Sequence, residues 1–218
     1  AGSGNDFALM NGLSADVQHA CETIVFGHSR LIDLGKIVLD GTITRYFDNA
    51  VGVGFDGLVC METRRNTRAR GLALYLPAVL KTIFFTLRAP QSKITIDGST
   101  MDAAPLMVTV CNGPREGGGF VLAPDARFDD GELDLVMVGH VNRVQMLMLV
   151  PRFLQGTHLS HPAVSKRTMR EMTMTSPDPL YTHVDGEVLT EIAHSIEITV
   201  VPQCLRLIVP ASQSGGTA

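Results

Sequence analysis

The chain has 218 residues, of which 45% are hydrophobic and 18% charged, and its formal net charge is -4. This composition supports a buried core and excludes a chain that is disordered throughout or forms a coiled coil. Because 18 Lys and Arg face 22 Asp and Glu, the chain lacks the basic excess that nucleic-acid phosphates attract, and we expect no nucleic-acid partner.

The first residues predict two short helices. The sequence favours one helix beginning at Asn5 or Asp6 and a second running from Ser14 to about residue 26, since both starts carry capping residues. The chain opens without Met and within a loop-like segment. We therefore expect a further segment upstream of residue 1.

From Ile32 onward the pattern changes to short alternating segments typical of β-strands. Asp-Gly pairs at 40–41, 97–98 and 185–186 favour hairpin turns, and the pair at 97–98 is expected to join strands at 93–96 and 106–111. Further strands are predicted at 35–39, 42–47, 132–138, 169–175, 195–201 and 204–209. The fold class is therefore α+β, mainly an antiparallel β-sandwich or flattened barrel with two or three helices.

Two longer helices interrupt the strands. Residues 71–87 are apolar nearly all round, and residues 142–155 begin with an Asn cap and are expected to bend or end at Pro151. The apolar stretch at 71–87 is too short to span a bilayer, and no secretory signal opens the chain. The small polar residues 211–218 are expected to be disordered.

The four cysteines lie far apart and form no C-x-x-C pair, at Cys21, Cys60, Cys111 and Cys204. This spacing indicates reduced thiols and hence a cytoplasmic protein. The pair His158 and His161 lacks the acidic partner of a helical zinc motif, so we interpret it as loop structure.

Two glycine-rich segments suggest anion binding. Gly2, Ser3, Gly4 and Asn5 precede a predicted helix, where free backbone N–H groups favour a phosphate, although an ordinary capped helix start has the same appearance. Residues 52–57 match the dinucleotide motif G-x-G-x-x-G. An apolar helix stands where that motif requires a ribose-binding acid about 20 residues later, which disfavours a dinucleotide site.

Two acidic turns suggest catalysis or metal binding. Residues 117–134 combine three glycines, a proline and several carboxylates, which suits a hard cation such as Mg²⁺ as well as it suits a solvated hairpin. Asp185 and Glu187 flank Gly186, and on an extended chain both carboxylates would face one side. Such a pair can supply a base for a hydroxyl nucleophile, and a plain turn looks the same.

Four arginines, at positions 64, 65, 68 and 70, precede the apolar helix. A solvated loop explains them, and so does contact with an anionic bilayer surface beside an apolar helix.

Several of these segments form a recognisable series in chain order: residues 2–8, 32–35, 53–57, Asn112 with 117–119, 123–126, 130–134, 156–162 and 185–187. The series resembles the diacylglycerol kinase catalytic family, especially its bacterial lipid kinases, from residue 2 to about residue 210. In that family an N-terminal α/β domain carrying Gly-Gly-Asp-Gly-Thr binds ATP, and a β-sandwich domain supplies metal and acid residues. This chain contains no Gly-Gly-Asp-Gly-Thr. The resemblance therefore implies a remnant of the ATP-binding domain at 1–31, a β-sandwich substrate and metal domain at 32–210, and a tail at 211–218.

The resemblance also implies roles for residues. Ser3 matches a nucleotide-contacting Thr, with Gly2, Gly4 and Asn5 beside it. Glu187 matches the proposed base in the family's Asp-Gly-Glu, which also contains Asp185. Asp130 matches a metal-ligating Asp, and Arg127 and Glu132 match positions that contribute main-chain carbonyls. The implied cofactors are ATP with Mg²⁺ and a separate structural divalent cation.

The function implied by this resemblance is transfer of the ATP γ-phosphate to a hydroxyl of a lipid alcohol, peripheral to the inner face of the membrane. Because most of the ATP site would lie upstream, we expect the 218 residues alone to be inactive, and their uncovered apolar surface to favour self-association. A non-catalytic lipid-binding or regulatory module is the alternative. A nicotinamide oxidoreductase is the least supported reading.

Overall fold

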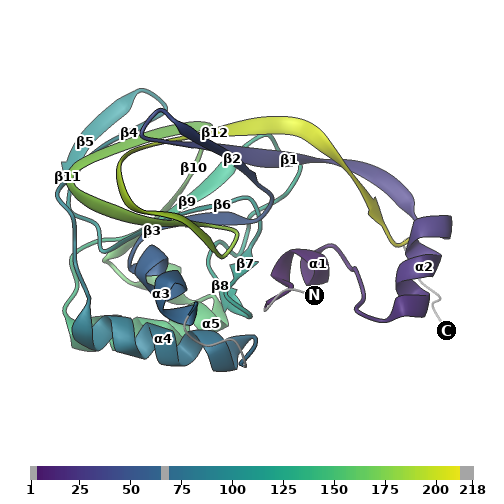
Figure 1. The fold of residues 1–218 in the computed structure, drawn as a ribbon, viewed down its shortest axis with the longest axis horizontal. Coiled ribbons are helices and arrows are strands. Elements are labelled where there is room, and N and C mark those ends of the chain that lie inside the picture. The colour runs from purple at the N-terminus through teal and green to yellow at the C-terminus, as the bar shows by residue number, and fades with distance from the viewer. Residues whose placement is uncertain (1–3, 65–68, 212–218) are drawn as a thin grey trace.

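The computed structural model describes residues 4–64 and 69–211 (Figure 1). Its helices are α1 (Asp6–Met10), α2 (Val17–Phe26), α3 (Phe55–Thr63), α4 (Leu72–Phe85), α5 (Arg143–Gln155) and the short 3-10 helix η1 (His158–Ser160). Its strands are β1 (His28–Leu39), β2 (Ile43–Phe47), β3 (Ala50–Gly54), β4 (Ser92–Ile96), β5 (Ser99–Ala103), β6 (Met107–Cys111), β7 (Arg115–Glu116), β8 (Phe120–Val121), β9 (Leu133–Val138), β10 (Val164–Met169), β11 (Glu171–Val184) and β12 (Glu187–Val209).

The strands form one antiparallel sheet that folds over on itself. Its order is β10-β9-β6-β3-β11-β12-β1-β2, with β4 paired to both β11 and β5, while β7 and β8 form a separate pair. Ile37 on β1 belongs to the same buried cluster as Val110 on β6 and Leu135 on β9, although β1 is far from both of these strands in the order. The sheet must therefore curve to enclose that cluster, which confirms the predicted sandwich-like, mainly antiparallel fold.

The three Asp-Gly pairs form hairpin turns as predicted. Both residues of each pair have positive φ, as in the tight turns that match strand twist. The turn at 97–98 joins β4 to β5, however, so the prediction that it joins the strands at 93–96 and 106–111 was wrong. Strand β5 was not predicted, because most of its side chains are exposed and polar.

Helices α3, α4 and α5 lie together on one face of the sheet (Figure 1). Their inner sides and strands β6 and β9 share a second buried cluster, which includes Phe55, Ile83, Val136 and Leu149. No helix was predicted at α3, whose first residues belong to the glycine motif at 52–57. The predicted helix at 142–155 begins at its expected cap, where Asn142 and Gln145 form a capping box, but it continues past Pro151 instead of ending there.

The remaining helical predictions are also refined. Asp16, and not Ser14, caps α2, since its carboxylate accepts the His19 N–H at 2.9 Å. His158 is buried, stacks on Phe153 with ring centroids 4.0 Å apart, and contacts the Leu122 carbonyl through Nε2 at 2.8 Å. It is structural, as interpreted. Among the described residues, no helix is long and apolar enough to cross a membrane.

A two-stranded extension projects from the sandwich body (Figure 1). Strands β1 and β12 continue as a two-stranded ribbon that ends at α2, and α1 lies between α2 and the body (Figure 1). Hydrophobic side chains of α2 are exposed, including those of Ile24, Val25 and Phe26. Residues 1–3, Arg65, Arg68 and the tail from 212 onward lie outside the described residues.

Candidate functional site

The predicted base and the described part of the predicted nucleotide loop line one cleft. Gly4 and Asn5 lie there with Asp185, Gly186 and Glu187, although about 180 residues separate the two segments in sequence. The cleft has a volume of about 350 Å³. Gly2 and Ser3 are not among the described residues, so their nucleotide contact stays a prediction.

The turn of β11 and β12 fixes how Glu187 is presented. The Asp185 carboxylate accepts backbone N–H groups from Asp48 (3.1 Å), Asn49 (3.1 Å) and Ala50 (2.9 Å), which ties the turn to the start of β3. The Asp185 carboxylate therefore positions the turn that carries Glu187. Glu187 is exposed on the cleft, and the described part of the chain provides no hydrogen-bond or ion-pair partner for its carboxylate.

The cleft is acidic. Burial, and then the neighbouring Asp185 carboxylate, raise the pKa of Asp48 to about 6. Burial also raises the pKa of Asp185, although its three backbone hydrogen bonds oppose that shift. Asp6 lies at the same cleft and accepts the Gly118 N–H at 2.7 Å. Such a site favours cations and groups that donate hydrogen bonds.

An apolar pocket adjoins this cleft. It lies among α3, α4 and α5, has a volume of about 60 Å³, and is lined by hydrophobic side chains that include Phe55, Val79, Met146 and Phe153. Tyr75, Glu116, Gly117 and Gly186 line both the pocket and the cleft. An apolar chain in the pocket would therefore place a polar head group at the cleft.

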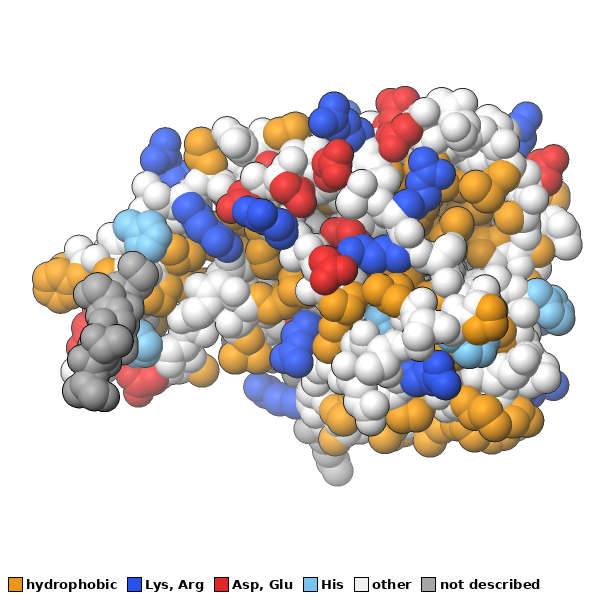
Figure 2. All heavy atoms as spheres, turned by 180° about the vertical axis from the view of Figure 1, so that it is seen from behind, with side chains coloured by type: hydrophobic (Ala, Val, Ile, Leu, Met, Phe, Trp, Pro, Cys, Tyr) orange, Lys and Arg blue, Asp and Glu red, His pale blue; other side chains and the backbone are white. Residues whose placement is uncertain are grey.

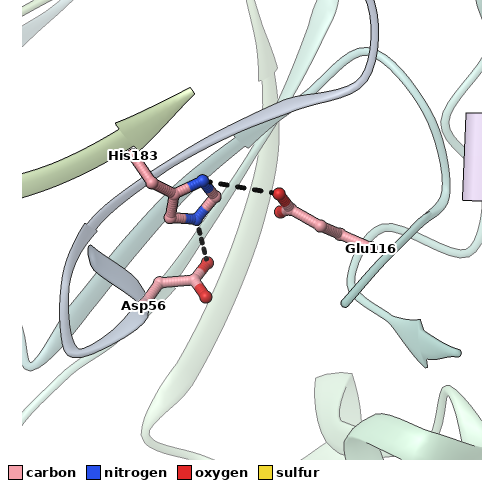
Figure 3. Close-up of side chains that lie close together, drawn as sticks. All are labelled: Asp56, Glu116 and His183. Carbon is pink, nitrogen blue, oxygen red and sulfur yellow. Dashed lines mark ion pairs between the residues drawn. The ribbon is translucent and has the colours of Figure 1, made fainter. Parts of the chain in front are cut away.

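Three ionisable side chains meet in the wall of the pocket (Figure 3). The two ring nitrogens of His183 face different carboxylates: Nε2 lies 3.5 Å from Asp56 Oδ2, and Nδ1 lies 3.5 Å from Glu116 Oε1. Thr109 donates its hydroxyl to Asp56 Oδ2 at 2.9 Å. We call Asp56, Glu116 and His183 the buried triad.

Burial and mutual attraction shift the pKa values of this triad. Burial alone would lower the pKa of His183, but the carboxyls of Glu116 and Asp56 outweigh it and raise the pKa to about 9. Although burial opposes it, His183 holds the pKa of Asp56 below its ordinary value. Burial raises the pKa of Glu116 to about 8 against the opposing charge of His183. The charges of the three groups therefore depend on one another: His183 and Asp56 stabilise each other's charged form, whereas burial opposes the charge of Glu116.

Comparison with known proteins establishes the family. A family model described as the YegS C-terminal NAD kinase beta sandwich-like domain matches residues 49–209, which is more than half of the chain. The chain belongs to this family.

Relatives of the YegS-type family include named kinases. The chain is 30% identical over 212 residues to a diacylglycerol kinase of Mycobacterium tuberculosis (strain CDC 1551 / Oshkosh). The aligned residues cover 96% of this chain and 67% of that relative. It is 26% identical over 211 residues to a probable YegS-like lipid kinase of Shewanella frigidimarina, covering 96% and 65%. The chain thus spans about two thirds of the length of these relatives.

Solved structures support the same fold. Two structures of Bacillus anthracis strain Sterne proteins named for diacylglycerol kinases match with TM-scores of 0.74 and 0.68, at 21% and 18% identity. Each match covers 97% of this chain, and 67% and 65% of the other chain. At these identities the likeness concerns the fold alone.

The cation residues expected for this YegS-type chain lie on one turn between β8 and β9. Asp130 is exposed, and its Oδ1 accepts the Glu132 N–H at 3.1 Å. Arg127 is exposed and its guanidinium lies 3.4 Å from Asp129. A carboxylate with the main-chain carbonyls of Arg127 and Glu132 would be an all-oxygen ligand set, which fits Mg²⁺ or Ca²⁺. Binding of an ion at this turn stays a prediction.

Sequence reasoning missed Asp33, which holds this turn in place. Asp33 is buried, and its carboxylate accepts the N–H groups of Gly131 and Gln203, each at 2.7 Å. The same turn carries Phe128, whose ring contacts Phe7 of α1 edge-to-face at a centroid distance of 5.4 Å. The turn therefore supports the N-terminal segment that lines the cleft.

The G-x-G-x-x-G motif serves packing in this YegS-type fold. A Cβ on Gly52 would lie 2.3 Å from His183 Nε2 and 2.5 Å from Asp56 Oδ2, so only glycine leaves room for the triad. A Cβ on Gly57 would lie 2.1 Å from the Tyr181 carbonyl oxygen. Strand β3 is antiparallel to both of its neighbours, whereas a dinucleotide fold requires a parallel unit.

The buried triad is the part of the site that the sequence did not reveal. Its members come from three separate places, the start of α3, β7 and β11, and no short spacing links them. The one available signal was His183, a polar residue within the hydrophobic end of a strand. The ligand atoms of the triad lie within 4.8 Å of one another, so a metal could be held there. The observed arrangement suits a histidine paired with two carboxyl groups better, since each ring nitrogen faces a different one and a metal would use only one ring nitrogen.

Large hydrophobic side chains are exposed on the outer sides of the two helices whose inner sides line the pocket. Hydrophobic side chains gather along the lower edge of the molecule, where α4 and α5 lie (Figure 2). They include Phe84 and Phe85 on α4 and Val144, Leu147 and Met148 on α5. We call these five residues the apolar helix surface. It is larger than scattered single exposures and resembles a contact site.

Proposed function

We propose that this chain is the acceptor-binding part of a lipid kinase that transfers the γ-phosphate of ATP to a hydroxyl of a lipid alcohol. One observation carries the proposal: an apolar pocket opens beside an acidic cleft that contains Glu187, Gly4 and Asn5. The kinase names of the relatives support it, as does the chain's coverage of about two thirds of their length.

In this proposal Glu187 removes the proton from the lipid hydroxyl as that oxygen attacks the γ-phosphorus, and ADP leaves. A general base of this kind contributes about 10²- to 10⁴-fold to the rate. Asp185 positions the turn that carries Glu187 through its three backbone hydrogen bonds. Gly4 and Asn5 approach the nucleotide. Mg²⁺ bound with ATP would neutralise charge on the phosphates.

The structural cation, if bound by Asp130 and the carbonyls of Arg127 and Glu132, would stabilise the turn that supports α1 through Phe128. The apolar helix surface would rest on a bilayer, so that a lipid can pass from the membrane into the pocket. We place the protein at the inner face of the membrane, in the cytoplasm, and expect exposed α2 to be covered by an upstream domain or by a second copy.

The test uses the natural coding region, read upstream of residue 1, together with an assay of its product with ATP and diacylglycerol. We expect an upstream Gly-Gly-Asp-Gly-Thr segment, turnover by the full protein, and a loss of about 10²- to 10⁴-fold in Glu187→Gln. The 218 residues alone should have negligible activity. Unchanged activity in Glu187→Gln would refute the role of this residue, and turnover by the 218 residues would refute the need for an upstream ATP site.

A non-catalytic lipid-binding module is the second candidate, because the described residues form an apolar pocket, whereas they include only Gly4 and Asn5 of the nucleotide loop. A natural start codon just before residue 1, with lipid binding and no turnover, would favour this candidate.

A further inference from the structure

Glu116 is a buried carboxyl group without a hydrogen-bond partner. It ends β7, is 9% exposed, and neither of its carboxyl oxygens has a hydrogen-bond partner among the described residues. The His183 Nδ1 contact at 3.5 Å is an ion pair and not a hydrogen bond. Buried polar groups in folded proteins are nearly always hydrogen-bonded, so this exception requires an explanation.

The other two members of the buried triad are partnered. Asp56 accepts the Thr109 hydroxyl at 2.9 Å, and His183 Nε2 lies 3.5 Å from Asp56 Oδ2. Of the three, only Glu116 has buried carboxyl oxygens without a hydrogen-bond partner among the described residues. A ligand that completes the site would therefore meet Glu116 first.

Glu116 also stands where a lipid head group would pass. It lines both the apolar pocket and the acidic cleft, and Gly186, which precedes Glu187, lines both as well. A lipid with its chain in the pocket and its reacting hydroxyl near Glu187 would bring the atoms next to that hydroxyl close to Glu116. Asp6, Asp56 and Asp185 add negative charge around it, which favours a donor or a cation over ester oxygens.

On the basis of the proposed function, we propose that Glu116 is a specificity-determining residue: it accepts a hydrogen bond from a second donor group beside the hydroxyl that is phosphorylated. The acceptor is then a lipid with an adjacent hydroxyl or ammonium group, and the ammonium is preferred because the surrounding carboxylates attract positive charge. A diacylglycerol presents ester oxygens at this place, which have no hydrogen to donate. Burial raises the pKa of Glu116 to about 8, and an ammonium group beside it would oppose that shift.

The experiment measures binding to the 218-residue chain in mixed detergent micelles, by displacement of a fluorescent long-chain alcohol. Three competitors with matched acyl chains are compared: a long-chain amino alcohol, a monoacylglycerol and a diacylglycerol. We expect the amino alcohol to bind at least about tenfold more tightly than the diacylglycerol, with the monoacylglycerol between them. The same ranking is then measured as kcat/KM in the full protein.

Two variants separate specificity from folding. Glu116→Ala should bring the three affinities to within about threefold of one another. Glu116→Gln keeps an acceptor but no charge, so it should lose the preference for the ammonium and keep that for the monoacylglycerol. Glu171→Gln, which removes an exposed carboxylate on β11, is the matched control and should leave the ranking unchanged. A merely structural role would weaken all three lipids equally.

An unchanged ranking in Glu116→Ala, or tighter binding of diacylglycerol than of the amino alcohol by the unchanged chain, would overturn this inference and leave the proposed function standing. Failure of all three lipids to displace the probe would overturn both.

Discussion

Substitution of Asp185 would show whether its carboxylate holds the Asp-Gly-Glu turn in place. Its carboxylate accepts three backbone N–H groups, two of them from the buried residues Asn49 and Ala50. A buried donor left without an acceptor costs about 1–3 kcal/mol. Asp185 also has a φ of 47°, a left-handed conformation that costs most side chains roughly 1–2 kcal/mol. We therefore expect Asp185→Ala to lower the free energy of unfolding by roughly 3–4 kcal/mol.

Asp185→Asn is the graded comparison. Asparagine tolerates positive φ, and its amide oxygen can replace Oδ1, which accepts from Asn49 and Ala50. Only the N–H of Asp48, which bonds Oδ2, then loses its acceptor. Because Asp48 is partly exposed and water can replace the bond, the expected loss is about 1 kcal/mol.

The assay is urea unfolding followed by far-UV circular dichroism, because the chain contains no Trp. Asp97→Ala is the matched control: Asp97 also has positive φ, but it accepts its two N–H groups from exposed residues. Its loss should be near 2 kcal/mol, between those of the two Asp185 variants. If Asp185→Ala changed stability by less than about 0.5 kcal/mol, as surface substitutions do, the positioning role would be refuted.

Two further predictions concern the triad and the apolar helix surface. The pKa of His183 is raised from 6.5 to about 9, and that of Glu116 from 4.5 to about 8. Because a raised pKa favours the folded state at low pH, the melting temperature should fall between pH 6 and pH 9, and it should fall less in Glu116→Gln. An equal fall in both proteins would contradict this linkage. The double variant Phe84→Ser/Phe85→Ser should float less with anionic liposomes than the unchanged chain does. The control Ile24→Ser alters a similarly exposed residue of α2 and should not weaken flotation. Equal loss of flotation in the double variant and in the control, or no flotation of the unchanged chain, would exclude this surface as a membrane contact.

The sequence was most informative where structure depends on local residues. The three Asp-Gly turns require positive φ at two successive positions, a conformation that few residue types adopt, so the pairs themselves predicted hairpins. The capping box of α5 is likewise encoded by Asn142 and Gln145 alone. Helix α3 was missed for the opposite reason. Its first residues belong to a glycine motif whose spacing is explained by contacts with β11 and the triad, and those contacts are not local.

For the site, sequence order and resemblance pointed to the Asp-Gly-Glu turn and the N-terminal loop, and the structure brings Gly4 and Asn5 to the same cleft as Glu187. The triad and Asp33 escaped prediction because each acts through partners from distant strands. Asp33 pairs with N–H groups about 100 and 170 residues away. The role of a buried polar residue can be assigned only when its hydrogen-bond partners are known. The alternation of polar and apolar residues along the sequence does not identify those partners.

The triad and the turn of Glu187 share one strand end, and this links acceptor choice to catalysis. His183 lies on β11 two residues before Asp185, and its ring contacts the Gly186 N–H as well as Asp56 and Glu116. A lipid group that satisfied Glu116 would therefore act on the same few residues that present Glu187 to the cleft. Under the proposed function, a lipid that leaves Glu116 unpartnered should lose rate as well as affinity, because the turn that positions the base would lack part of its support. A poor acceptor should thus show a lower kcat in addition to a higher KM, and an effect on KM alone would mean that the pocket and the turn act independently.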